Sequence, residues 1–209
     1  MKLIQLKHPD KWSQENLIRE CLNQNEKAQR FLFESHQRKM FAVCMRYLDN
    51  EDEAFDVLNE AFLKVFEKLK LLNSETKIEA WIRRIVVNTA LDYIRKNKSY
   101  RTTFIKTEEQ EQYECPDQDS NDLSGWWSEA LEIPQERLFL EINRLPKASR
   151  LVFNLFVLDD LSHREIAKQL GISEATSRWH ISNAREILKK NILSILNEEF
   201  INEQQQQKY

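Results

Sequence analysis

The stretch LSHREIAKQLGISEATSRWHISNAREILKK, residues 161–190, decides the fold of the C-terminal part of the chain. Ser162 and Glu165 have the spacing of a capping box, which predicts a short helix over residues 163–170. Gly171, one of only two glycines in 209 residues, supplies the left-handed residue that commonly ends a helix. The helical pattern therefore stops at this glycine and starts again after it.

Ser173 is a good N-cap for a second helix, which we expect from residue 174 to about residue 188 or beyond. Ile181 and Leu188 lie on one face of this helix and predict packing against the preceding helices. The opposite face includes Trp179 and is expected to meet solvent. A short supporting helix that presents the exposed face of a second one is typical of helix-turn-helix DNA readers, although similar pairs also occur as plain packing units.

The residues expected on or beside the exposed face are mostly polar. Those that point away from the packed face are Trp179, Ser182, Asn183 and Glu186, flanked by Arg178 and Arg185 and, on the opposite flank, by His180. Side chains of this kind suit base edges and phosphates in a DNA groove.

The composition predicts an all-α protein. Apolar residues make up 41% of the chain and charged residues 31%, with only four prolines, so hairpin-turn residues are scarce and helix formers are abundant. Three widely separated cysteines offer neither a disulfide framework nor a Cys-x-x-Cys metal site. Because no apolar run suits a signal peptide or a membrane span, we expect a cytoplasmic protein without membrane insertion.

The formal net charge of −3 averages over regions of opposite sign. Residues 77–101 contain seven basic and two acidic residues, whereas residues 108–136 contain ten acidic residues and no basic one. This acidic segment predicts a linker between two helical domains. The segment is either a solvated tether or a mimic of a nucleic-acid backbone inside a basic channel. Its Trp126 and Trp127 are expected to pack against a surface, because large aromatic side chains are unfavourable in water.

Apolar periodicity before the linker predicts four helices. The first begins near residue 12 and the second spans about residues 27–48. The third begins after residue 50, and the fourth spans residues 78–96. The first turns of the third helix hold Asp52, Glu53, Asp56, Asn59 and Glu60. Acidic residues there complement the helix dipole, and they suit docking onto a basic helical partner equally well.

In the fourth helix, Arg84, Asn88 and Arg95 share one narrow stripe, with Trp81 about one turn before it. Basic side chains interleaved with aromatic rings are typical of binding sites for single-stranded nucleic acid. The alternative makes Trp81 a core residue and Asn88 a buried hydrogen-bonding group. The residues alone leave both interpretations open.

In this order the segments resemble the extracytoplasmic-function (ECF) group of bacterial sigma factors, the promoter-recognition subunits of RNA polymerase. The family's polymerase-binding helix resembles the segment DNEDEAFDVLNEAFLKVFEKL. Its promoter-melting and −10-reading helix is similar to AWIRRIVVNTALDYIRK. Its −35-reading domain is similar to LPKASRLVFNLFVLDDLSHREIAKQLGISEATSRWHISNAREIL. The resemblance implies four segments: a region 2-like domain at 1–102, an acidic flexible linker at 103–133, a region 4-like helix-turn-helix domain at 134–200 and a polar tail at 201–209.

The resemblance also implies roles for single residues. The implied contacts to the β′ clamp helices of the polymerase are Asp56, Asn59, Glu60 and Phe62. The implied −10 contacts are Leu72, Asn73, Trp81, Arg84, Asn88 and Arg95. The implied −35 contacts are Thr176, Arg178, Trp179, Ser182, Asn183 and Arg185.

Several positions depart from the family pattern. Asn59 stands where Gln is common, Ser177 replaces an aliphatic residue, and Trp179, His180 and Asn183 stand where Ser and Arg are frequent. These changes leave the implied general function intact but change the expected −35 sequence, because Asn prefers adenine edges where Arg prefers guanine.

The implied function is promoter-specific transcription initiation with core RNA polymerase, bound through its β′ clamp helices and β flap. Promoter DNA and an anti-sigma factor are the other implied partners. No paired carboxylates, Gly-rich phosphate loop or Cys/His metal spacing occurs, so we expect neither an enzyme nor a cofactor. Two alternatives stay open: a dimeric helix-turn-helix transcriptional regulator and a helical protein-interaction adaptor.

Overall fold

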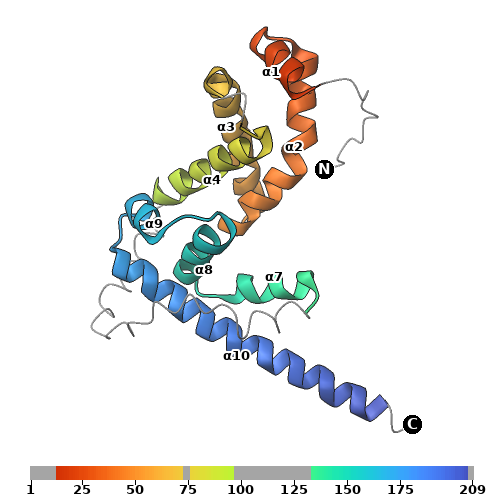
Figure 1. Cartoon of the computed structure of the whole chain (residues 1–209), viewed down its shortest axis with the longest axis vertical. Helices are drawn as coiled ribbons and strands as arrows, with labels where there is room; N and C mark the ends of the chain where they lie inside the picture. Colours follow the sequence, from red (N-terminus) through yellow and green to blue (C-terminus); the bar gives the residue numbers. More distant parts are fainter. Residues whose placement is uncertain (1–12, 73–75, 97–132, 207–209) are drawn as a thin grey trace. The chain divides into compact units, whose positions relative to one another are not determined.

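The computed structural model describes residues 13–72, 76–96 and 133–206. The chain divides into two compact units, Met1–Lys96 and Asn97–Tyr209 (Figure 1). Helices account for the secondary structure of the described residues, and none of those residues lies in a strand, which confirms the all-α prediction. The predicted linker up to residue 132, with Trp126 and Trp127, lies outside the described residues, as does Asn73.

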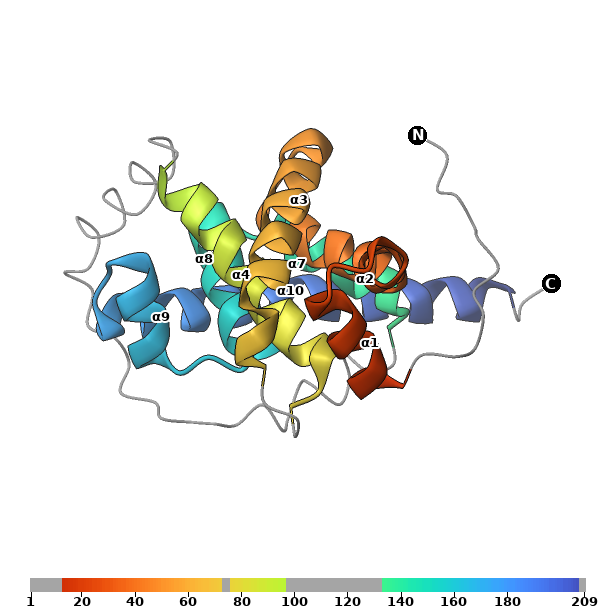
Figure 2. The same cartoon turned by 90° about the horizontal axis from the view of Figure 1, so that it is seen from above.

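The described residues of the N-terminal unit form four α-helices and a short 3-10 turn. They are α1 (Gln14–Leu22), α2 (Glu26–Tyr47), α3 (Glu51–Lys68), the turn η1 (Leu69–Leu71) and α4 (Ile78–Lys96). Ser13, Asn25 and Asn50 cap the first three helices, since each side chain accepts a hydrogen bond from a backbone N–H of the first turn. Helices α2, α3 and α4 pack on one another and enclose the core (Figure 2).

The core of this unit is built from apolar residues at helical spacing. Its fully buried side chains include Leu32, Met40, Leu58, Ile82 and Leu91. Because each helix buries one stripe of such residues, its opposite stripe is left for polar side chains.

The C-terminal unit contains α7 (Gln135–Arg144), α8 (Lys147–Phe153), a π-helical segment η2 (Asn154–Leu158), α9 (His163–Leu170) and α10 (Glu174–Gln206). Helices α7 and α8 each begin directly after a proline, Pro134 or Pro146, whose fixed φ suits entry into a helix. Helix α10 packs against α7, α8 and α9.

The predicted helix, glycine turn and helix are confirmed at α9 and α10. Ser162 and Glu165 form the complete capping box, in which the Ser162 backbone N–H donates to Glu165 Oε2 over 2.9 Å. Gly171 has φ 69° and ψ 34°, the left-handed conformation. Ser173 then caps α10, because its Oγ accepts a hydrogen bond of 2.9 Å from the Thr176 backbone N–H.

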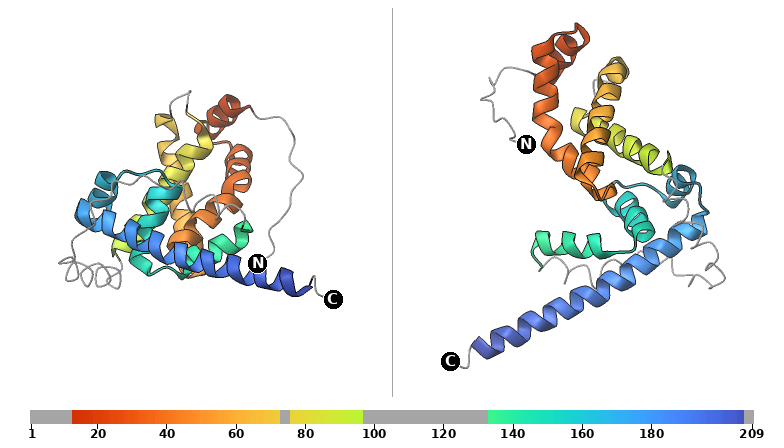
Figure 3. Two further views of the ribbon diagram at one scale, coloured as in Figure 1. Left: turned by 60° about the horizontal axis from the view of Figure 1, so that its bottom comes forward. Right: turned by 180° about the vertical axis from the view of Figure 1, so that it is seen from behind.

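Helix α10 is longer than a recognition helix requires. It spans 33 residues, which corresponds to a rise of about 50 Å, and continues to Gln206 (Figure 3). The glutamine-rich end therefore extends the helix past residue 200, the implied end of the domain. In the described part of the chain, no helix combines the length and apolar character that a membrane crossing needs.

Candidate nucleic-acid interface

The polar stripe of α4 lies on the surface. Arg84, Asn88 and Arg95 are all exposed, and Arg95 forms an ion pair with Asp92 of the same helix. The opposite side of α4 is buried through Ile82, Val86, Val87, Thr89, Ala90, Leu91 and Ile94. Since Asn88 is exposed, it is not the buried hydrogen-bonding group that the core interpretation required.

The other residues implied for this surface are less exposed. Trp81 is half-buried, so one part of its ring packs on the unit and another part meets solvent. Leu72 is also half-buried, where the chain leaves η1. At the start of α4, Glu79 forms an ion pair of 3.0 Å with Lys39 of α2, and the hydrogen bond from Lys39 lowers the pKa of Glu79.

The acidic face of α3 is exposed at Asp56, Asn59 and Glu60. Phe62 does not belong to this face: it is 2% exposed, and its ring packs edge-on against Phe33 with the ring centroids 4.7 Å apart. The implied direct contact of Phe62 with a partner is wrong in this structure, because Phe62 shares the buried stripe of α3 with Leu58 and Val65.

The residue after Phe62 occupies the exposed position instead. Leu63 is 65% exposed and follows Asp56, Asn59 and Glu60 at helical spacing. The period of 3.6 residues counted from Asp56 was the signal that could have selected Leu63 over Phe62.

The first four turns of α10 carry the predicted DNA-facing side chains. Arg178 and Ser182 are exposed, and Arg178 forms an ion pair of 3.2 Å with Glu174 one turn earlier. Trp179 and Asn183 are half-buried at the edge of this surface. Arg185 is half-buried as well, and its Nε atom is buried without a hydrogen-bond partner.

Two residues expected at this surface are buried. Thr176 is fully buried, and its Oγ1 lies 2.7 Å from Ser173 Oγ at the start of α10, so it supports the helix cap and cannot meet DNA directly. His180 is 1% exposed and lies on the flank of α10 that packs on α8, not on an open flank. A step of one residue turns a side chain by 100°, which separates these buried positions from exposed Arg178.

Two serine and histidine pairs, one buried and one part-buried, join α10 to its neighbours. His180 Nδ1 lies 3.0 Å from Ser149 Oγ of α8, and Asn183 Nδ2 donates to the same oxygen over 3.1 Å. On the other side, His163 Nδ1 of α9 lies 2.9 Å from Ser177 Oγ. Burial lowers the pKa of His180 to about 4. No local sequence pattern identifies these pairs, because their partners are distant in the chain.

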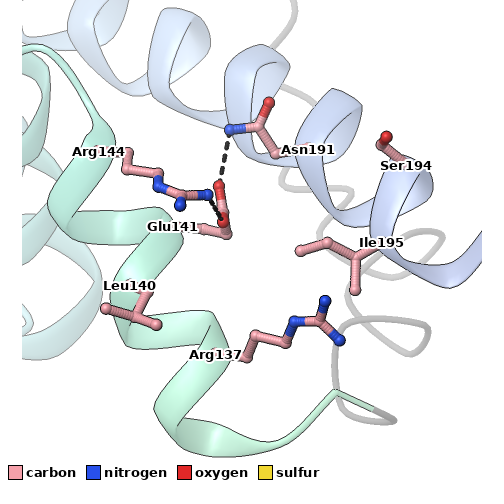
Figure 4. Close-up of a pocket in the computed structure, with 7 residues that line it drawn as sticks. All are labelled: Arg137, Leu140, Glu141, Arg144, Asn191, Ser194 and Ile195. Atoms are coloured by element: carbon pink, nitrogen blue, oxygen red, sulfur yellow. Dashed lines mark hydrogen bonds and ion pairs between the residues drawn. The ribbon is translucent and has the colours of Figure 1, made fainter. Parts of the chain in front are cut away.

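A cavity of about 330 Å³ lies between α7 and α10 (Figure 4). Its lining residues are Arg137, Leu140, Glu141, Arg144, Asn191, Ser194 and Ile195. Glu141 is buried and accepts hydrogen bonds from Arg144 Nη1 over 2.5 Å and from Asn191 Nδ2 over 2.9 Å. Leu140 is 58% exposed at this cavity. None of these residues was among the site residues predicted from the sequence.

Two family models match the chain, and together they cover more than half of it. The model of sigma-70 region 2 matches residues 32–100, and the model of sigma-70 region 4 matches residues 135–188. The first match contains the stripe of α4 and the acidic face of α3, and the second contains the exposed surface of α10.

The chain is similar to ECF RNA polymerase sigma-E factors along most of its length. The protein of Escherichia coli K12 is 29% identical over 184 residues, which cover 86% of this chain and 94% of that protein. The protein of Haemophilus influenzae is 26% identical over 182 residues, with 86% and 95% covered.

Two similar solved structures are CnrH in complex with the cytosolic domain of CnrY and the sigma factor RpoE of Bartonella quintana in complex with the anti-sigma factor NepR. The first is 20% identical with a TM-score of 0.44 and covers 85% of this chain and 96% of its own. The second is 16% identical with a TM-score of 0.43 and covers 79% and 96%. On the two family matches and the sigma-E relatives, the chain belongs to the sigma-70 family, as a sigma factor of the ECF group.

Proposed function

We propose that this protein binds core RNA polymerase, directs it to promoters with particular −35 and −10 elements, and assists promoter melting. The observation that carries the proposal is the exposed stripe of Arg84, Asn88 and Arg95 within the region 2 match. We propose domain limits of 1–102 for the region 2-like part and 134–200 for the region 4-like part. The protein would act in the cytoplasm and would catalyse no reaction itself.

At the −10 element, α4 would hold bases that have left the DNA stack. Arg84 and Arg95 would neutralise phosphates, Asn88 would hydrogen-bond a base edge, and Trp81 would offer a ring for stacking. Leu72 and Asn73 would line the same strand. Unstacking a base costs a few kcal/mol, so melting needs these contacts together with polymerase binding.

At the −35 element, the N-terminal half of α10 would lie in the major groove. Exposed Arg178 and Ser182 would contact base edges and phosphates, with Trp179 and Asn183 at the edge of the contact. The part of the half-buried Arg185 side chain that meets solvent would contact a phosphate at the edge of the groove.

Two surfaces would bind the polymerase. The acidic face of α3, with Asp56, Asn59, Glu60 and exposed Leu63, suits the β′ clamp helices, because it combines negative charge with an apolar contact. The cavity between α7 and α10, whose lining is mostly polar with Leu140 and Ile195 as its apolar residues, would bind the β flap. The acidic linker would follow the basic channel of the polymerase, and an anti-sigma factor would compete for these surfaces.

Run-off transcription from a pool of candidate promoters tests the proposal. Purified bacterial core polymerase is assayed with and without the protein, and transcripts that appear only with the protein support a sigma factor. If no template responds while the free protein footprints a palindromic duplex, the dimeric regulator is the better account. If neither occurs, the helical adaptor is favoured.

A further inference from the structure

Asn183 is joined to a residue outside the recognition helix. Its Nδ2 atom donates a hydrogen bond of 3.1 Å to Oγ of Ser149, which lies on α8, 34 positions earlier in the chain. Ser149 is 1% exposed, whereas Asn183 is half-buried at the edge of the DNA-facing surface. The bond therefore ties one end of a surface amide to the buried core of the unit.

Ser149 is itself oriented by His180. The Ser149 hydroxyl has one proton to donate, and its oxygen accepts from Asn183, so its proton is available to the His180 Nδ1 atom 3.0 Å away. Burial lowers the pKa of His180 to about 4, so the imidazole is neutral near pH 7 and Nδ1 can accept. The Asn183 amide donates to Ser149 Oγ with either tautomer of the neutral imidazole, because a hydroxyl oxygen can accept two hydrogen bonds.

The two bonds leave a defined set of groups on Asn183. One amide N–H points to Ser149, which leaves the second N–H and the Oδ1 acceptor for other partners. One donor and one acceptor side by side match the N7 and N6 groups of adenine in the major groove. An amide without the bond to Ser149 could rotate and exchange its donor and acceptor positions, which weakens discrimination between bases.

We propose that Ser149 is a positioning residue for base recognition: it fixes the amide of Asn183 so that this side chain selects adenine at one position of the −35 element. This inference rests on the proposed function at the same surface. The edge of the Trp179 ring packs against His180, with the centroids 5.0 Å apart, so the same buried pair also holds the aromatic neighbour of Asn183 in place.

The experiment measures binding of reconstituted holoenzyme to promoters that carry every single base-pair substitution in the −35 element. The wild type should prefer adenine at one position by roughly tenfold, the order expected for a bidentate asparagine contact. Asn183→Ala should reduce that preference to within about twofold and leave the other positions unchanged. Ser149→Ala should do the same although it removes no group that reaches DNA.

Ser177→Ala is the matched control. It removes the hydroxyl of the other serine and histidine pair, 2.9 Å from His163 Nδ1, and this serine is not hydrogen-bonded to Asn183. This variant should keep the adenine preference. If loss of a buried hydroxyl instead destabilised the whole C-terminal unit, both serine variants would lose the preference. The double variant Ser149→Ala with Asn183→Ala should match Asn183→Ala alone, because both act through one side chain.

The inference is overturned if Ser149→Ala keeps the adenine preference that Asn183→Ala loses, or if the wild type has no such preference. Should Ser149→Ala not fold, as judged by thermal melting, Ser149→Cys serves instead, since a thiol accepts hydrogen bonds only weakly. Failure of the proposed function is distinct: wild-type protein would then confer no promoter binding on core polymerase. The same substitution series on free protein and duplex DNA would still test the role of Ser149.

Discussion

The two surfaces assigned to DNA are built differently. On α4, Arg84, Asn88 and Arg95 stand on the outside of a helix whose opposite side fills the core. On α10, the corresponding surface is tied to its neighbours, since Asn183 is hydrogen-bonded to Ser149 of α8 and the Trp179 ring packs on buried His180.

This difference suits the two forms of DNA that we propose for these surfaces. Unstacked bases can adjust to a protein surface, so an exposed stripe of cations, an amide and an aromatic ring suits them. A duplex presents base edges at fixed positions, so side chains that contact them gain from being held in one orientation.

The largest expected effect distinguishes core from surface on α3. Phe62→Ala should lower the free energy of unfolding of the N-terminal unit by about 3–5 kcal/mol, because it empties a buried aromatic site. Leu63→Ala should change it by no more than about 0.5 kcal/mol, because that side chain is exposed, yet it should weaken binding to core polymerase. Urea unfolding and a polymerase pull-down measure the two quantities. Equal stability losses in both variants would contradict the assignment.

The next effect concerns pH and the C-terminal unit. The pKa of His180 falls from its usual 6.5 to about 4 on folding, so between these values the unfolded chain binds a proton that the folded unit does not. The stabilising contribution is therefore complete above about pH 6.5 and is lost as the pH falls towards 4, by about 3 kcal/mol in total.

His180→Gln should remove this contribution to the pH dependence, because glutamine does not titrate but can still hydrogen-bond Ser149. Urea unfolding at about pH 7.5 and about pH 5 gives the stability loss of each protein over this interval. The wild type should lose more stability than the variant. An identical loss would show that His180 is not shielded from protonation in the folded state.

These residues also show what local sequence could predict. The capping box of Ser162 and the left-handed Gly171 follow from neighbours within a few positions, and both occur in the structure. The sequence left open whether Asn88 of α4 is exposed or buried, and the structure shows it exposed. The burial of Phe62, Thr176 and His180 was not foreseen, because it depends on which flank of a helix meets another helix.

The link between Ser149 and Asn183 depends on tertiary contact in the same way, since 34 positions separate the two residues. Local periodicity places a side chain on a face, but its partner comes from the packing of a different helix. The helical faces that carry the polar side chains were thus predictable from sequence, whereas the bonds that orient these side chains were not.

A smaller effect is expected at the turn between α9 and α10. Gly171→Ala should destabilise the C-terminal unit by about 1 kcal/mol, because φ of 69° is unfavourable for a residue with a Cβ. A Cβ there would meet no atom within 4 Å, so backbone strain is the only cost. Gly171→Asn should cost less, since asparagine tolerates this conformation better. Thermal melting ranks the variants, and an alanine variant as stable as wild type would contradict this account.

The smallest effect separates phosphate contacts from base contacts on α10. Arg185→Ala should weaken holoenzyme binding by a similar factor on all −35 sequences and reduce the slope of log K against log salt by about 1. Electrophoretic titrations over a series of salt concentrations give this slope. An altered sequence preference with an unchanged slope would instead make Arg185 a base contact.

The most direct test of the difference between the two surfaces is to footprint a promoter with holoenzyme containing wild type, Asn88→Ala or Arg178→Ala, while permanganate reactivity of unpaired thymines reports melting. Asn88→Ala should keep protection of the −35 element and lose reactivity at −10, since its side chain is proposed to meet only the melted strand. Arg178→Ala should lose −35 protection first. Loss of −35 protection in Asn88→Ala, or normal melting in that variant, would contradict the assignment of α4 to the single strand and α10 to the duplex.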